Sequence, residues 1–179
     1  MAEVGFLERL LRAEAELGLV GARFILAAGR GYGAHASSDD FPRGIPQACY
    51  ANAFRLSQED ERLTYVEGVA LSLGIVPIEH AWCVNREGLI VDNTWDGREQ
   101  QYYGVAFDSA WMAGRVLSQG RFGIMPELFP RDLLDLDPST FLAMPTPSQA
   151  LAVRSLFAVV LDEIRQRSRS NQRADRKGG

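Results

Sequence analysis

Three side chains that could form a nucleophilic site occur in the order cysteine, histidine, aspartate. Cys49 follows Pro46 at the expected start of a helix over residues 47–57, and proline is favoured at the first helical position. A thiol in a first helical turn lies near unpaired N–H groups and the positive end of the helix dipole, which favour the nucleophilic thiolate. His80 and Asp92 follow in a predicted β-hairpin. A base that takes the thiol proton, oriented by a carboxylate, is the general arrangement of an activated nucleophile.

The register of this hairpin decides which side chain meets His80. Side chains alternate along a strand, so Cys83 points away from His80 and is expected in the core. Asn-Arg-Glu-Gly at residues 85–88 supplies the turn. A turn with an odd number of residues places Asp92 opposite His80 on the same face, whereas an even number brings Asn93 into play. The sequence leaves both registers open.

The elements that must position these residues are predicted from hydrophobic spacing. Residues 6–17 repeat apolar positions at helical intervals, and Gly18 is a suitable end. Residues 20–28 are apolar without a clear period, so either a strand or a buried helix fits them. Strands are expected over residues 63–71 and 101–107, and Asp108 or Ser109 then caps a helix. A final helix starts at Pro147, with its apolar stripe at positions 153, 156, 157, 160, 161 and 164.

This order of elements predicts an α+β fold. An antiparallel β-sheet would pack against the Cys-bearing helix, with flanking N- and C-terminal helices. The 179 residues, 46% hydrophobic, suit one domain over residues 1–164. Residues 165–179 are rich in arginine and lack an apolar face, so we expect a disordered basic tail. Such a tail could contact RNA weakly, but a solvated tail is the interpretation we favour.

Composition makes several classes of function unexpected. The net charge of −4 gives no reason to expect nucleic acid as the main partner. No apolar run has the length of a membrane helix, and the N-terminus lacks the pattern of a signal peptide, so we expect a cytoplasmic protein without a membrane partner. Two cysteines are too few for a disulfide framework and match no familiar zinc spacing, so no cofactor and no metal are expected.

The glycine-rich stretch at residues 29–40 could suggest a phosphate-binding loop. It lacks the Gly-Lys-Ser/Thr of such loops and falls short of a dinucleotide fingerprint. We interpret it as a flexible surface loop, close enough to border a substrate cleft. His35 lies in this stretch among polar neighbours, and we expect it to be exposed and without a role.

The motifs His-Ala-Trp at residues 80–82 and Asp-Asn-Thr-Trp at residues 92–95 resemble those of a known group. Together with Cys49, they are similar to the transglutaminase-like superfamily of papain-like cysteine enzymes, which includes transglutaminases, peptidases, amidases and arylamine acetyltransferases. The resemblance covers residues 45–107 and implies a Cys-bearing helix packed on an antiparallel sheet. Many members have Asp-Pro-Thr in place of Asp-Asn-Thr, and many have Trp where this chain has Tyr50.

The resemblance also implies roles. Cys49 would attack a carbonyl carbon, His80 would take its proton and deliver it to the leaving amine, and Asp92 would hold the imidazole. The N–H of Cys49 or Tyr50 would bind the oxyanion. Papain-like peptidases add a glutamine several residues before the cysteine, whereas Gln47 is only two before it. Asn93 is the alternative orienting residue, and the substrate cleft would be lined by Trp82, Trp95, Tyr102 and Tyr103.

The function implied is a cysteine hydrolase or acyltransferase that forms a thioester from a peptide, a protein or a small amide. Two other interpretations stay open. A binding module could keep the fold and lack the chemistry. Alternatively Cys49, His80 and Asp92 could ligate zinc, since all three residue types do so in proteins. The sequence does not identify the substrate and does not separate hydrolysis from transfer.

Overall fold

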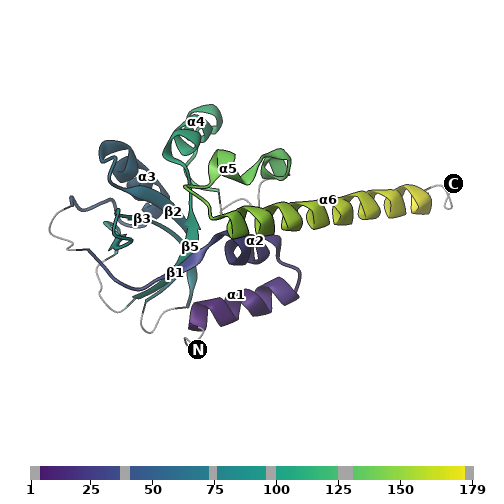
Figure 1. Cartoon of the computed structure of the whole chain (residues 1–179), viewed down its shortest axis with the longest axis horizontal. Helices are drawn as coiled ribbons and strands as arrows, with labels where there is room; N and C mark the ends of the chain where they lie inside the picture. The colour runs from purple at the N-terminus through teal and green to yellow at the C-terminus, as the bar shows by residue number, and fades with distance from the viewer. Residues whose placement is uncertain (1–4, 37–40, 73–75, 96–99, 125–130, 176–179) are drawn as a thin grey trace.

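The computed structural model describes residues 5–36, 41–72, 76–95, 100–124 and 131–175, which form an α+β fold (Figure 1). Five antiparallel strands lie in the order β1-β5-β2-β3-β4. The strands are β1 (Arg30–Tyr32), β2 (Thr64–Ser72), β3 (Ile78–Val84), β4 (Ile90–Val91) and β5 (Gln100–Ala106). The helices are α1 (Phe6–Glu16), α2 (Val20–Ala28), α3 (Cys49–Glu59), α4 (Ser109–Gln119), the 3₁₀ helix η3 (Arg131–Asp135), α5 (Pro138–Phe141) and α6 (Pro147–Asp175).

The two edges of this curled sheet are joined by residues 30–36. At one edge, β1 pairs with β5, and Gly31 lies opposite Tyr103. A few residues later the same segment meets the other edge, where Ala36 N donates to Ile90 O and Ile90 N donates to Ala34 O. One short segment therefore supplies one edge strand, β1, and covers the other, β4, so that the backbone groups of Ile90 are paired.

Two separate hydrophobic clusters lie on the two faces of the sheet. The larger contains Tyr65, Ala81 and Cys83 from the strands and buried side chains from α1, α2, α3, α4 and α6. The smaller lies within the curl and comprises Tyr32, Val66, Ala70, Trp82, Val84, Ile90 and Tyr102. The alternation predicted for the strands is confirmed, because Cys83 and Trp82 belong to different clusters.

The Trp82 ring is accommodated by a glycine on the neighbouring strand. A β-carbon at Gly104 would lie 2.6 Å from the Trp82 ring and even closer to the backbone of Glu67. Because only glycine leaves this space, Trp82 fills the interior of the curl and is fully buried. Trp82 thereby lies beside His80, the preceding residue on the same face of β3, and the two ring centroids are 6.3 Å apart.

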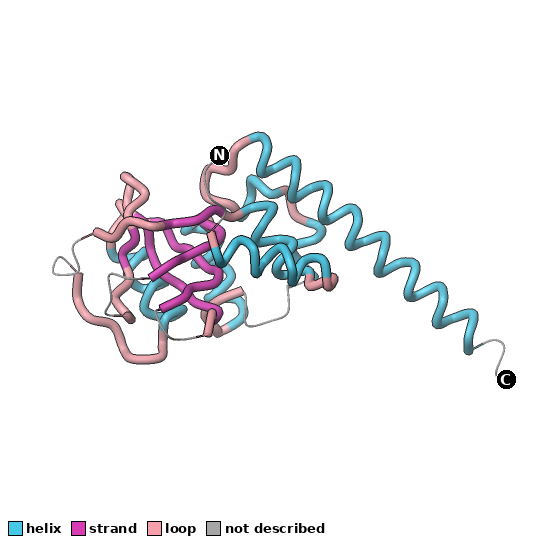
Figure 2. The backbone as a smooth tube through the Cα atoms, turned by 90° about the horizontal axis from the view of Figure 1, so that it is seen from below, coloured by secondary structure: helices cyan, strands magenta, loops and turns pink. Residues whose placement is uncertain are grey.

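Several predicted elements are confirmed, and the open choices are now decided. Residues 20–28 form helix α2, and the apolar stripe of α6 packs on the larger cluster. Asp108 caps α4, since its side chain accepts a hydrogen bond from Trp111 N at 2.8 Å. Figures 1 and 2 show α6 extending well beyond the sheet. Residues 165–175 continue this helix, whereas the composition predicted a disordered tail from residue 165.

The flexible loop predicted over residues 29–40 is wrong for its first part. Residues 30–32 form β1, and His35 bridges to Ile90. The glycines of this stretch favoured the prediction of a loop. The edge strand β1 forms because it pairs with β5, which lies far along the chain. His35 is half-buried rather than exposed, with its ring 5.5 Å from that of Tyr102. Residues 37–40 lie outside the described part of the chain.

Candidate active site

Cys49 is the first residue of helix α3, two residues later than the predicted start. Pro46 lies in the preceding turn, and Gln47 has a φ of 63°, a conformation that non-glycine residues adopt uncommonly. This turn brings the chain into the helix at Ala48, the N-cap residue, whose side chain makes no capping hydrogen bond. The half-buried Cys49 thiol therefore lies in a first turn whose N–H groups have no capping side chain, and the backbone of Tyr50 in this turn forms a hydrogen bond with it.

His80 lies on β3 and is held by Asp92, which follows β4. The distance from His80 Nε2 to Asp92 Oδ2 is 2.7 Å, and both side chains are almost fully buried, at 1% and 2% exposure. Val84 pairs with Ile90, so the turn has five residues, 85–89. This odd number puts Asp92 on the same face as His80. In this register, however, Asp92 lies two residues away from the position directly opposite His80.

Cys49 meets β3 beyond the point where the ladder between β3 and β4 ends. Pairing between the two strands covers Cys83–Val91 and Val84–Ile90, so the ladder ends before His80. The N-terminus of α3 approaches β3 at this point, where the backbone of Ala81 forms a hydrogen bond with the Cys49 sulfur. Because Asp92 occupies Nε2, we assign the hydrogen bond between His80 and Cys49 to the other ring nitrogen, Nδ1.

These contacts shift the ionisation of both partners toward a thiolate–imidazolium pair. Burial alone would raise the pKa of Cys49, but hydrogen bonds from His80 and from the backbones of Ala81 and Tyr50 lower it overall. Burial alone would lower the pKa of His80, yet the hydrogen bonds to Asp92 and Cys49 raise it to about 9. The stabilisation that His80 contributes is complete below its unfolded pKa of about 6.5, and it is lost as the pH rises through about 9.

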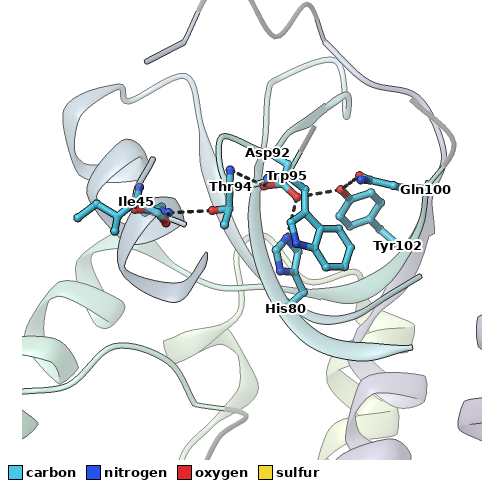
Figure 3. A network of polar contacts seen from close by, with 8 residues as sticks. Ile45, His80, Asp92, Thr94, Trp95, Gln100 and Tyr102 are labelled. Atoms are coloured by element: carbon cyan, nitrogen blue, oxygen red, sulfur yellow. Dashed lines mark hydrogen bonds and ion pairs between the residues drawn. The ribbon is translucent and has the colours of Figure 1, made fainter. Parts of the chain in front are cut away.

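The Asp92 carboxylate is fixed by four hydrogen bonds (Figure 3). Its Oδ1 accepts from the backbone N–H groups of Thr94 at 2.9 Å and Trp95 at 3.2 Å. Its Oδ2 accepts from Tyr102 at 2.8 Å as well as from His80. Burial opposes ionisation of Asp92, but the contacts with His80, Thr94 and Tyr102 lower its pKa overall. Asp92 therefore faces His80 as a carboxylate with a fixed orientation.

Aromatic side chains surround the His80 ring in a different way from that predicted. Trp95 stacks on His80, with ring centroids 4.3 Å apart and an angle of 19° between the planes. Tyr102 is buried behind Asp92, and its hydroxyl also meets the Gln100 side chain. Trp82 and Tyr102 thus form the buried rear of the site and have no open surface for a substrate. Tyr103 points to the opposite face of the sheet, in the larger cluster.

A second set of hydrogen bonds holds the segment that precedes Cys49. Asn52, one turn into α3, accepts from Ile45 N at 3.0 Å and donates to Ile45 O at 2.7 Å. It also donates to Thr94 Oγ1 at 2.9 Å, next to Asp92 (Figure 3). Asn93 does not contact His80; its side chain donates to Pro42 O at 3.2 Å. The approach to Cys49 and the loop after Asp92 are therefore one connected unit.

We expect Asn52→Ala to lower the free energy of unfolding by about 2 kcal/mol, because the buried Asn52 side chain makes two part-buried hydrogen bonds to the backbone of Ile45 that alanine cannot replace. Urea unfolding followed by circular dichroism measures this difference. Asn93→Ala is the matched control, since its single, exposed hydrogen bond should change stability by less than about 1 kcal/mol. Equal effects of the two substitutions would contradict the assigned role of Asn52.

We expect Tyr102→Phe to reduce stability at pH 7 by about 1–2 kcal/mol, because the ionised Asp92 loses a donor. The lowered pKa of Asp92 contributes stability above its unfolded pKa, and this is lost as the pH falls through the folded pKa. The difference between wild type and Tyr102→Phe should therefore shrink in acid. Tyr103→Phe, on the other face of the sheet, should show no such pH dependence in urea titrations from pH 7 to pH 3.

The remaining candidate residues have clear positions. Gln47 is exposed in the turn before Cys49, and Tyr50 packs against Gly123, where a β-carbon would lie 2.6 Å from its ring. Cys83 is fully buried, and its S–H donates to Ala53 O at 3.1 Å. Burial raises the pKa of Cys83 strongly, so the chain contains two cysteines with opposite character.

Two residues of this site, Asn52 and Gln100, were not predicted from the sequence, and Tyr102 was predicted to line a cleft. A buried Asn within a helix start is a signal that could have been used, since buried polar side chains need partners. The positions of Gln100 and Tyr102 on the face of His80 follow only from the pairing of β2 with both β3 and β5.

A zinc site formed by Cys49, His80 and Asp92 is the alternative interpretation of these residues. Within the described ranges, no group of three or more His, Cys, Asp or Glu side chains is arranged to hold a metal ion. Both ring nitrogens of His80 already have partners in Asp92 and Cys49.

Among the residues that the structure describes, no helix is both long enough and apolar enough to cross a membrane.

In comparisons with known proteins, no protein-family model, no curated protein and no solved structure matched the chain.

Proposed function

We propose that the protein is a cysteine hydrolase or acyltransferase that acts on an amide through a thioester on Cys49. The observation that carries this proposal is the contact of Cys49, at the N-terminus of α3, with a His80 ring fixed 2.7 Å from Asp92. Such an arrangement supplies a nucleophile, a base and a group that orients the base.

In the first step, the Cys49 thiolate attacks the carbonyl carbon, so that a C–S bond forms and the carbonyl electron pair moves to oxygen. The unpaired N–H groups in the first turn of α3 are the donors nearest to this developing oxyanion. Exposed Gln47 is a candidate for a further donor from the preceding turn.

The tetrahedral intermediate then breaks its C–N bond. The His80 imidazolium gives its Nδ1 proton to the leaving amine, and a thioester remains on Cys49. In the second half, water or an amine attacks the thioester while His80 takes the proton, and Cys49 leaves as a thiolate. Asp92 and the stacked Trp95 keep the imidazole in place through both halves.

The overall arrangement supports assignment to the transglutaminase-like superfamily of papain-like cysteine enzymes. A helix that starts with the cysteine packs on an antiparallel sheet, His80 lies on β3, and Asp92 follows the neighbouring strand β4. Peptides, proteins and small amides are the substrate classes that this assignment favours.

Acylation by 4-nitrophenyl acetate tests the proposal without a known substrate. We expect a burst of nitrophenolate and one acetyl group on the Cys49 peptide, detected by mass spectrometry. Cys49→Ala should abolish both signals, whereas Cys83→Ala, which removes the buried thiol, should retain them. Equal nitrophenolate release by wild type and Cys49→Ala would contradict the proposal and would favour a binding module.

A further inference from the structure

A groove of about 400 Å³ lies between α1, α2 and the start of β3. Its walls are mostly aliphatic and include Leu10, Leu19, Val20, Ile25, Val69 and Ile78. Leu19 and Ile78 keep 51% and 40% of their surfaces exposed, so an apolar occupant would remove substantial hydrocarbon surface from water.

Two carboxylates interrupt this apolar surface. Glu14 on α1 and Glu79 on β3 both line the groove, and none of the described residues lining it is cationic. In the described part of the chain, neither carboxylate has a salt-bridge partner. Burial and, to a smaller extent, the charge of Glu14 raise the pKa of Glu79, so Glu14 disfavours the ionised form of Glu79. A cation placed between them would relieve this repulsion.

We propose that this groove is a subsite for an aliphatic chain that ends in a cation, an alkylammonium or guanidinium group carried by the substrate. The apolar walls would contact the chain, and Glu14 and Glu79 would pair with its charged end. A carboxylate-bound ammonium stays protonated and is not a nucleophile. The group in the groove therefore recognises the substrate and does not react.

The groove lies near the proposed nucleophile, and its role in substrate recognition rests on the function proposed above. Glu79 directly precedes His80 on β3 and points to the opposite face, on which α3 packs. Burial raises the pKa of Tyr50, and the negative charges of Glu67, Glu79 and Cys49 add to this shift, so Tyr50 senses the charges of both Glu79 and Cys49. In this proposal, a substrate with its cation at Glu79 would extend along the first turn of α3 toward Cys49.

Binding of hexylammonium chloride, followed by amide shifts in NMR spectra, tests the groove directly. We expect saturable shifts at residues that line the groove, and weaker binding of hexanol and hexanoate, which share the chain but lack the cation. Glu14→Gln and Glu79→Gln should each weaken hexylammonium binding by roughly threefold to tenfold. Glu16→Gln, an exposed carboxylate on the same helix that does not line the groove, is the matched control.

Equal binding of hexylammonium and hexanol, or no effect of either groove substitution, would overturn the proposal. Cys49→Ala should bind hexylammonium like wild type, so this result is independent of the reactivity of Cys49. The link to the substrate is tested with nitrophenyl esters of N-acetyl-lysine and N-acetyl-norleucine. We expect kcat/KM for acylation to favour lysine in wild type and this preference to fall by about threefold or more in Glu79→Gln.

Discussion

A His80→Ala variant is expected to form the acyl-enzyme with 4-nitrophenyl acetate about 10³-fold more slowly than wild type at pH 7. His80 hydrogen-bonds to Cys49 and lowers its pKa, so its removal leaves a partly buried thiol with less thiolate at neutral pH. The same change removes the group that would deliver a proton to a leaving amine. Stopped-flow measurement of the nitrophenolate burst gives the rate.

His35→Ala is the control for this substitution, because it makes the same chemical change at the other histidine. His35 contacts the Tyr102 ring and makes no hydrogen bond to Cys49 among the described contacts. We expect its burst rate to stay within about threefold of wild type. Added imidazole should partly restore His80→Ala, since the cavity left by the ring can admit it. A burst rate in His80→Ala equal to that of wild type would contradict the role of His80.

The second large effect is expected for Asp92→Asn, which should lower the acylation rate by about 10³-fold while keeping the fold. The orientation of the new amide is fixed by the backbone. Oδ1 must still accept from Thr94 N and Trp95 N, so the amide NH₂ faces His80 Nε2. Nε2 must then accept, and the single imidazole proton remains on Nδ1. An imidazole protonated at Nδ1 cannot take the Cys49 proton.

Asp60→Asn is the matched control for this experiment. Asp60 pairs with Arg62 on the surface, away from Cys49, and its substitution should leave acylation unchanged. Circular dichroism should show the native spectrum for both variants, since asparagine has the shape of aspartate. A rate for Asp92→Asn within about threefold of wild type would mean that the carboxylate does not control the His80 tautomer.

The sequence predicted the elements that carry the site better than the contacts that complete it. The order of helices and strands, the face of His80 and the core position of Cys83 follow from hydrophobic periodicity and strand alternation, which are local properties. The exact start of α3 does not follow from these local properties. It depends on the positive φ of Gln47 and on the hydrogen bonds between the Asn52 side chain and the backbone of Ile45.

Contacts between distant segments account for the differences. Tyr102 reaches Asp92 because β5 pairs with β2, which in turn pairs with β3. Residues 30–32 pair with β5 although Gly31 lies among them and glycines flank them on both sides, a composition that local propensity assigns to a loop. The choice between Asp92 and Asn93 depends on a five-residue turn, and neither residue type nor composition specifies that length.

The most direct test of the site is the pH dependence of iodoacetamide alkylation at Cys49, measured by peptide mass spectrometry in wild type and His80→Ala. A thiolate–imidazolium pair predicts fast alkylation well below the ordinary cysteine pKa of about 8.5, and its loss in His80→Ala. Cys83 is the internal control and should stay unlabelled while the protein is folded, because it is fully buried. Slow alkylation of Cys49 that follows an ordinary thiol and is indifferent to His80 would contradict the account.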